Sequence, residues 1–261
     1  MSEKPKQLGR VNLRYGDETA HHCPDHGEFR GRPFTLTGDN WLQPSCPQCE
    51  EEHRERLAER DAQAKREAES RRMASSGIPP RFRAATLQNY AAECPGQRRA
   101  LDVVSRYLDR FEDRRRVGGS LMLLGFTGNG KTHLACALVQ ALMAAGWHAM
   151  YTDIMGMVQA IRSTYGRGMA ESEQEAIARY LAPDLLVIDE VGVQYGTDAE
   201  RALVHHVLDR RYLALRPTLV AGNVDMDGLT AYLGERAVSR LHEANGLAVT
   251  FDWDDHRMRR D

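Results

Sequence analysis

The sequence predicts an α/β fold in which a parallel sheet is covered by helices on both faces, preceded by a small cysteine-rich segment and a charged helix. Three observations carry this prediction. Short strands that are apolar throughout alternate with helical stretches in the carboxyl-terminal part of the 261 residues. Residues 50–72 are mostly charged, as in an exposed helix, and two closely spaced pairs of cysteine and histidine ligands precede them.

The chain divides by composition into three parts. Residues 1–49 contain turn formers, histidines and cysteines without a sustained helical period. In residues 50–72, 15 of 23 residues are charged, and Leu57 is the only large apolar residue, so this helix cannot form a coiled-coil seam. We therefore interpret residues 50–74 as a charged helical linker. Serine, glycine and paired prolines follow it and mark the start of a second domain, residues 75–261.

The second domain alternates helices and strands. Its helical patterns cover residues 101–111, 131–145, 154–165, 171–181 and 198–215, and its short apolar strands cover residues 120–124, 147–152, 185–189 and 218–221. Strands without a polar face are typical of a parallel sheet buried on both sides.

Composition excludes several classes of protein. The 35 basic and 37 acidic residues leave a net charge of −2, which rules out a uniformly basic nucleic-acid coat and an acidic disordered tail. The amino terminus has no apolar run, and no segment approaches the roughly 18 apolar residues of a membrane span. We expect a cytoplasmic protein without a membrane partner. Five cysteines, three of them beside histidine, favour a reduced compartment and a metal site over a disulfide framework.

The cysteine-rich segment has the spacing of a structural zinc site. Cys23 and His26 form one pair, Cys46 and Cys49 form the other, and 19 residues separate the pairs. Each two-residue gap lets both ligands of a tight turn reach one ion, so three thiolates and one imidazole would complete a closed tetrahedral shell for Zn²⁺. His21 or His22 could replace His26 as the fourth ligand. A segment with so few large apolar residues needs such a metal in order to fold.

A phosphate-binding loop follows the first apolar strand of the second domain. The pattern G-x-x-x-x-G-K-[ST] is met by Gly125, Phe126, Thr127, Gly128, Asn129, Gly130, Lys131 and Thr132. Backbone N–H groups of such a loop, with the start of the next helix, surround phosphate oxygens. Lys131, the only lysine after Lys65, would reach the β- and γ-phosphates of ATP, and Thr132 would ligate Mg²⁺. The alternative is a glycine-rich turn between a strand and a helix.

Two further strand ends carry polar side chains. Asp189 and Glu190 end the strand over residues 185–189, and Asn223 follows the next strand. The carboxyl ends of parallel strands face the ligand crevice. We therefore expect Asp189 to hold the Mg²⁺ shell, Glu190 to polarise the attacking water, and Asn223 to orient that water or contact the γ-phosphate. Acidic residues that merely end a strand at the surface are the alternative.

At these residues the sequence resembles the AAA+ family, and especially the DnaC-type helicase loaders and IstB-type transposition ATPases. The resemblance covers about residues 75–256. It rests on residues 77–82, 89–90, 96–97, 131–135 with His133 after the loop, 185–192 and 229–241. The last segment is similar to the one that carries the arginine finger of the loaders, which implies Arg240 as the finger and Arg236 as its nucleotide- or interface-facing partner. A finger acts in trans, so the resemblance implies a homo-oligomer.

The resemblance further implies ATP-dependent loading of the replicative helicase hexamer onto single-stranded DNA. Tyr165, with Arg162 and Arg167 near it, lies where the loaders carry an aromatic residue thought to touch the strand; a tyrosine packed in the core is the alternative. The zinc domain would bind the helicase or, alternatively, DNA. Two other functions stay open: an IstB-type ATPase helper of a transposase, and a zinc adaptor that uses ATP only structurally.

Overall fold

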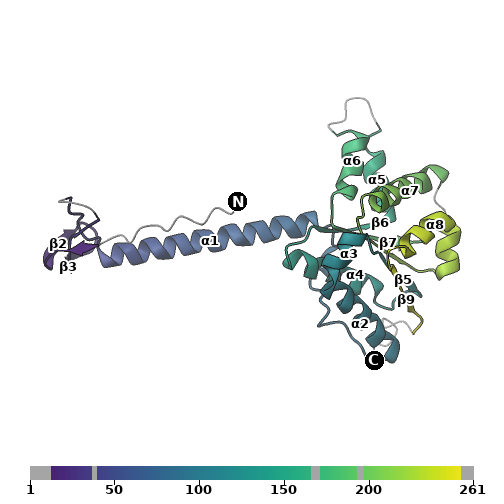
Figure 1. The fold of residues 1–261 in the computed structure, drawn as a ribbon, viewed down its shortest axis with the longest axis horizontal. Helices are drawn as coiled ribbons and strands as arrows, with labels where there is room; N and C mark the ends of the chain where they lie inside the picture. Colours follow the sequence, from purple (N-terminus) through teal and green to yellow (C-terminus); the bar gives the residue numbers. More distant parts are fainter. Residues whose placement is uncertain (1–12, 37–39, 166–170, 193–196, 254–261) are drawn as a thin grey trace, which may run out of the picture. The chain divides into compact units, whose positions relative to one another are not determined.

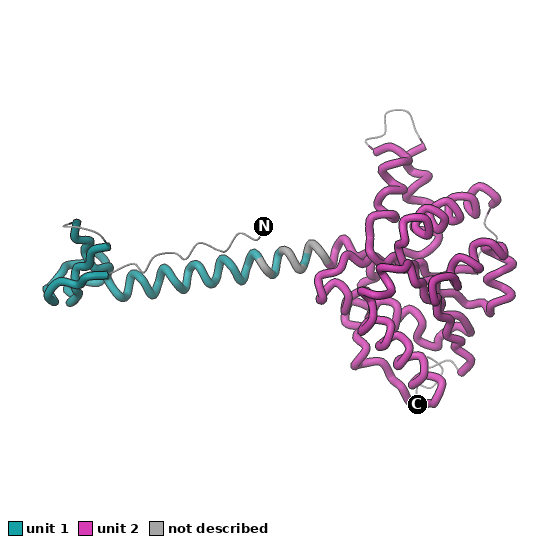
Figure 2. The backbone as a smooth tube through the Cα atoms, viewed as in Figure 1, with its two compact units in different colours: residues 1–70 teal, residues 71–261 magenta. Residues whose placement is uncertain are grey.

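The computed structural model describes residues 13–36, 40–165, 171–192 and 197–253. The chain divides into two compact units, Met1–Ser70 and Arg71–Asp261, which are coloured separately in Figure 2. The boundary between them lies within one long helix, α1, which covers Pro47–Ser75.

The first unit contains two small antiparallel sheets and most of α1. Strand β2 (Thr19–Cys23) pairs with β3 (Gly27–Gly31), and the two-residue strands β1 (Arg14–Tyr15) and β4 (Phe34–Thr35) pair with each other. The composition of residues 1–49 had indicated turns without resolving these strands. Helix α1 begins with Pro47, a residue that suits a first helical turn. Every side chain in residues 50–64 is exposed, as expected of a helix with no apolar face.

The second unit is built on a parallel five-stranded sheet in the order β6-β7-β8-β5-β9. The strands are β5 (Leu121–Gly125), β6 (Ala149–Asp153), β7 (Leu185–Val191), β8 (Thr218–Gly222) and β9 (Leu247–Phe251). Four of them confirm the predicted strands. Strand β9 was not predicted, and it pairs along the whole of β5 at one edge of the sheet.

Helices cover both faces of the sheet, as predicted (Figure 1). One face carries α2 (Pro95–Asp109), α3 (Phe111–Val117) and α4 (Lys131–Ala144); the other carries α5 (Ile154–Arg162), α6 (Glu173–Leu181), α7 (Asp198–Leu213) and α8 (Met226–His242). Each face of the sheet has its own hydrophobic core, and alternate strand residues point into the two cores. Leu121 and Leu123 pack against the first group of helices, and Met122 and Leu124 pack against the second. This two-sided burial explains why the strands are apolar throughout.

Some helix boundaries differ from the sequence prediction for local reasons. The helix predicted to begin at Leu101 begins instead at Pro95, because Cys94 and Gln97 form a reciprocal capping box at its start. It ends at Asp109, and a second short helix starts at Phe111. Within α8 the backbone is kinked at Gly234, where φ is 77°. No helix within the described ranges is long and apolar enough to cross a membrane.

Candidate nucleotide site and metal centre

The phosphate-binding loop joins β5 to α4, and two of its glycines are required by their surroundings. Gly125 has φ 133°, and a Cβ there would lie 2.1 Å from the carbonyl oxygen of Phe251. Gly130 has φ 90°, and a Cβ there would lie 2.6 Å from the Tyr90 ring. Strand β9 also supports the loop directly, because the Phe126 N–H donates to the Phe251 carbonyl at 3.1 Å. Side chains at these two glycines would therefore displace the loop.

A cavity of about 490 Å³ lies over this loop. Its walls bring together the predicted residues from three elements: residues 127–133 of the loop and α4, Asp189 and Glu190 of β7, and Asn223 after β8. Gly125 and Phe126 belong to the loop but not to the walls, and the Phe126 side chain points into solvent with 71% exposure. The cavity is large enough for a nucleotide, and Lys131, Asp189 and Glu190 make its walls polar.

Another part of the cavity wall was not predicted as part of the site. It comes from the segment that follows α1 and is formed by Arg81, Phe82, Ala84, Ala85 and Asn89. Helix α4 holds this segment in place, because Gln140 donates to the carbonyls of Phe82 at 3.2 Å and Ala85 at 2.6 Å. The His133 ring lies 3.0 Å from the Thr86 carbonyl. Residues 77–82 had contributed only to the family resemblance, since nothing in their pattern indicates where they fold.

Lys131 and Thr132 are both engaged within the loop region. The Lys131 ammonium donates to the carbonyls of Gly125 at 2.9 Å and Phe126 at 2.5 Å, so the side chain curls back over its own loop. The Thr132 hydroxyl donates to Asp189 Oδ2 at 2.7 Å. A hydroxyl and a carboxylate in contact offer the hard oxygen donors that Mg²⁺ prefers, so this pair fits a magnesium ion beside bound phosphate.

Asp189 is 3% exposed and is held by three donors. Its Oδ2 accepts from the Thr132 hydroxyl and from the Tyr151 hydroxyl, the latter at 2.9 Å, and its Oδ1 accepts from the Glu190 N–H at 2.8 Å. Tyr151 lies on the neighbouring strand β6 and was not predicted as a site residue. Nothing in an apolar strand sequence distinguishes this tyrosine from a core residue.

Glu190 lies at an irregular point of β7. Its φ of 59° is left-handed, and the pairing of β7 with β8 shifts register between Ile188 and Val191. This bulge turns the Glu190 side chain to the exposed side at the cavity wall. Partial burial raises the pKa of the Glu190 carboxyl, and the charges of Asp189 and Asp153 add to the effect. A carboxylate with a raised pKa is better suited to accept a proton.

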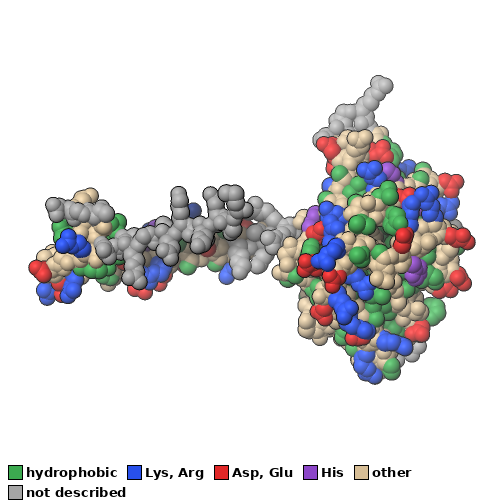
Figure 3. Space-filling model, viewed as in Figure 1, with side chains coloured by type: hydrophobic (Ala, Val, Ile, Leu, Met, Phe, Trp, Pro, Cys, Tyr) green, Lys and Arg blue, Asp and Glu red, His purple; other side chains and the backbone are tan. Residues whose placement is uncertain are grey.

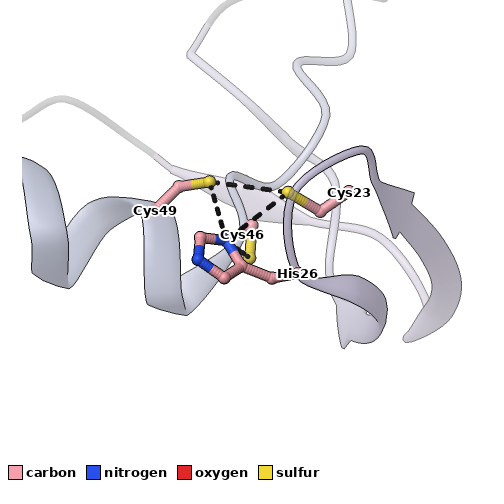
Figure 4. Close-up of side chains that lie close together, drawn as sticks. All are labelled: Cys23, His26, Cys46 and Cys49. Atoms are coloured by element: carbon pink, nitrogen blue, oxygen red, sulfur yellow. Dashed lines mark hydrogen bonds between the residues drawn. The ribbon is translucent and has the colours of Figure 1, made fainter.

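The four predicted metal ligands converge in the first unit. The ligand atoms of Cys23, His26, Cys46 and Cys49 all lie within 4.8 Å of one another (Figure 4). His26 Nδ1 is 3.2 Å from the Cys49 sulfur, and the Cys23 and Cys49 sulfurs are 3.5 Å apart. A tetrahedron with zinc–ligand bonds of about 2.0–2.3 Å has edges of roughly 3.3–3.8 Å. The donor set and its spacing therefore fit Zn²⁺.

Neighbouring groups orient His26 and favour the thiolate form of Cys23. His26 Nε2 lies 2.9 Å from a carboxylate oxygen of Glu52, the usual second contact of a zinc-bound imidazole, which leaves Nδ1 to face the thiols. The N–H groups of Asp25 and then His26 lower the pKa of the Cys23 thiol to about 7. The cluster includes neither of the alternative histidines, and His21 instead stacks on Phe29 with ring centroids 5.4 Å apart.

The predicted arginines lie away from the cavity of their own chain. Arg240 forms an ion pair with Asp209 of α7, and its guanidinium lies over the Tyr212 ring at 4.9 Å. Arg236 is exposed one turn earlier on the same helix. Neither arginine lines the nucleotide cavity. Their assigned roles stay predictions.

The residues predicted to contact DNA are described in part. Tyr165 is 55% exposed, so the alternative of a core-packed tyrosine is wrong; its hydroxyl donates to Glu173 at 3.1 Å. Arg162 pairs with Glu200 at 2.9 Å. Arg167 lies outside the described residues.

Comparison with known proteins identifies related sequences and folds. Residues 58–241 match the family model of the IstB-like ATP binding protein. The replicative helicase loader DnaC of Escherichia coli K12 is 34% identical over 184 residues, which cover 70% of this chain and 74% of DnaC. A crystal structure of the DnaC helicase loader matches with a TM-score of 0.60 at 25% identity, covering 66% of this chain and 99% of that one.

The fold extends to another AAA+ protein. AMPPCP-bound DnaA from Aquifex aeolicus matches with a TM-score of 0.56 at 24% identity, over 69% of this chain and 53% of DnaA, which shows a common fold. The family match begins after Cys49, so it does not cover the metal cluster.

Proposed function

The chain belongs to the family of IstB-like ATP-binding proteins, and on this premise we propose that it loads the replicative DNA helicase onto single-stranded DNA, with ATP binding and hydrolysis gating its contacts. One observation carries the proposal: the 34% identity with a replicative helicase loader over 184 residues. That stretch is long enough to include the phosphate loop and the carboxylates that share its cavity.

The nucleotide cavity supports an ATPase role. ATP would occupy it with its phosphates on the loop, and Lys131 would exchange its two carbonyl partners for the β- and γ-phosphates. Thr132 and Asp189 would hold Mg²⁺, which neutralises the charge that develops on the phosphates. Glu190, on its bulge, would accept a proton from the attacking water, and Asn223 would orient that water.

Arg240 and Arg236 would complete the site of a neighbouring subunit. Both lie outside the nucleotide cavity of their own chain, which is the arrangement that action in trans requires. Asp209 and Tyr212 hold the Arg240 guanidinium between α7 and α8, where the Arg240 side chain is 18% exposed. We assign Arg240 as the finger and Arg236 as an interface residue, and full ATPase activity then depends on a homo-oligomer.

The first unit would hold Zn²⁺ through its four converging ligands and serve as the head that binds the helicase. It carries exposed hydrophobic side chains, some of which are visible in Figure 3. Those with 43–62% exposure are Leu13, Tyr15, Leu36, Trp41 and Leu42, which precede α1, and Leu57 on α1. Large exposed apolar side chains gathered in a unit this small favour a protein partner over a DNA backbone, which basic residues would bind.

Single-stranded DNA would contact the second unit at Tyr165. Its exposed ring can stack on a base, and Arg162 next to it can reach a phosphate once it leaves Glu200.

Binding to the helicase and to DNA tests the proposal. Wild-type protein and the Trp41→Ser/Leu42→Ser double variant should be compared for binding to the helicase hexamer and to single-stranded DNA. The double variant should lose helicase binding and keep both its zinc and its ATP binding. Undiminished helicase binding would show that the zinc unit is not the helicase-binding head. Failure of the wild type to bind the helicase would contradict the loader assignment.

A further inference from the structure

Asp189 is held from two sides, and only one of them belongs to the nucleotide cavity. We propose that Tyr151 is a positioning residue for magnesium: its hydroxyl holds the Asp189 carboxylate in the orientation that receives Mg²⁺ with the nucleotide. This inference rests on the proposed ATPase function and adds to it a residue outside the phosphate loop.

The contacts divide the two oxygens of the carboxylate between three donors. Oδ1 is occupied by the Glu190 N–H at 2.8 Å. Oδ2 accepts the Thr132 hydroxyl at 2.7 Å and the Tyr151 hydroxyl at 2.9 Å. With 3% exposure, Asp189 has little access to water that could replace a lost donor. Each of these hydrogen bonds to a buried charge is therefore worth more than one at the surface.

Nucleotide binding should affect the two hydroxyls that donate to Oδ2 differently. Thr132 lines the cavity and is the expected Mg²⁺ ligand, so its hydroxyl must turn a lone pair toward the metal. Tyr151 does not line the cavity and approaches the carboxylate from the next strand. Its hydrogen bond can therefore stay unchanged through the nucleotide cycle and keep the carboxylate from rotating.

The position of Tyr151 is itself closely determined. In the sheet, Tyr151 on β6 pairs with Val187 on β7, and two residues further along Asp153 pairs with Asp189. The Tyr151 N–H donates to the Ser76 carbonyl at 2.7 Å, and a Cβ at Gly77 would lie 2.0 Å from the Tyr151 carbonyl oxygen. The side chain is 5% exposed and packs in the hydrophobic core on that face of the sheet. Such a fixed ring can hold a carboxylate precisely.

The test compares Tyr151→Phe with wild type in the full chain. Equilibrium binding of ATP is measured by calorimetry as Mg²⁺ is titrated, and again with EDTA in place of Mg²⁺. Phenylalanine keeps the packed ring and removes only the donor. The Mg²⁺ concentration that gives half-maximal enhancement of ATP binding should rise about tenfold, as expected for one hydrogen bond to a charged group. Metal-free ATP binding should change less than about twofold on the same grounds.

Tyr107→Phe is the matched control. Tyr107 is equally buried, and its hydroxyl donates to the Gly119 carbonyl at 2.8 Å, with no contact to Asp189. It should lower thermal stability somewhat less than Tyr151→Phe, because its acceptor is a neutral carbonyl, and leave the Mg²⁺ dependence at the wild-type value.

Two results would overturn the inference while leaving the proposed function intact: an unchanged Mg²⁺ dependence in Tyr151→Phe, or an equal loss of binding with and without metal. A wild-type protein whose ATP binding does not respond to Mg²⁺ would overturn both.

Discussion

Replacing Arg211 with lysine should destabilise the second unit by about 2–4 kcal/mol, although the charge is kept. Arg211 lies on α7 and is fully buried, with 0% exposure. Its guanidinium donates through all three nitrogens: Nε to the Thr218 hydroxyl at 3.1 Å, Nη1 to the carbonyls of Tyr180 at 2.9 Å and Pro183 at 3.0 Å, and Nη2 to the Pro217 carbonyl at 2.6 Å. This fork joins the end of α6 to the starts of β7 and β8.

The magnitude follows from counting acceptors. A lysine ammonium presents three donors on one atom, so it can reach at most part of a set of acceptors arranged around three nitrogens. We expect at least two buried acceptors to lose their partner, each at a cost of about 1–2 kcal/mol. The ammonium is more strongly hydrated than the guanidinium, so its desolvation adds to this loss. Burial lowers the pKa of Arg211 to about 9.

Urea unfolding followed by circular dichroism and tryptophan fluorescence measures the difference. The midpoint should fall with an unchanged slope, because the surface exposed on unfolding is the same. Arg210→Lys is the control, since Arg210 is the preceding residue and is exposed; it should change stability by less than about 0.5 kcal/mol. A loss below about 1 kcal/mol in Arg211→Lys would refute the acceptor argument.

Three further predictions concern the sites. Glu190→Gln should reduce ATP hydrolysis about 100-fold and leave ATP binding within about twofold, measured by single-turnover hydrolysis and calorimetry. In the wild type, hydrolysis needs the deprotonated Glu190 carboxylate, so the rate should fall as the pH drops through a pKa above the ordinary 4.5. If hydrolysis by the glutamine variant fell over the same pH range, Glu190 would not be the proton acceptor. Cys49→Ser should lower bound zinc from about one ion per chain and remove the NMR dispersion of β2 and β3, while ATP binding stays unchanged; full zinc content would show that Cys49 is not a ligand. Asp209→Asn should release Arg240 from a partly exposed pair worth about 0.5–1 kcal/mol and raise ATP hydrolysis about two- to fivefold, only at concentrations where chains associate. An equal rise in dilute protein would count against action in trans.

The sequence predicted most reliably what depends on neighbouring residues. The phosphate loop is contiguous and fixed by its own glycines, so its pattern needed only a preceding strand and a following helix. Asp189 and Glu190 could be placed beside it because carboxyl ends of parallel strands meet at one edge of the sheet. The zinc ligands were equally local, since each pair occupies one turn.

What the sequence did not predict depends on tertiary contacts. The wall around Phe82 and Ala85 has no periodic pattern, and Gln140 on a distant helix determines where it lies. Strand β9 follows two residues with positive φ, Ala244 and Asn245, of which alanine is an unusual turn residue. Its contact with the loop at Phe251 could not be inferred from spacing.

The sequence also could not predict which single polar side chains make buried hydrogen bonds. Arg211 and Arg210 are identical neighbours in the chain, yet one is fully buried and the other exposed. Tyr151 reads as an ordinary strand residue, and only the alignment of β6 with β7 brings its hydroxyl to Asp189.

The most direct test of ATP-gated helicase loading is the amount of replicative helicase hexamer transferred to circular single-stranded DNA. It should be measured with wild-type protein and with Lys131→Ala, each with and without ATP and Mg²⁺. Transfer should require ATP in the wild type and fall at least tenfold in the variant, since Lys131 would contact the β- and γ-phosphates. Equal transfer by Lys131→Ala, or transfer independent of ATP, would contradict ATP-gated loading.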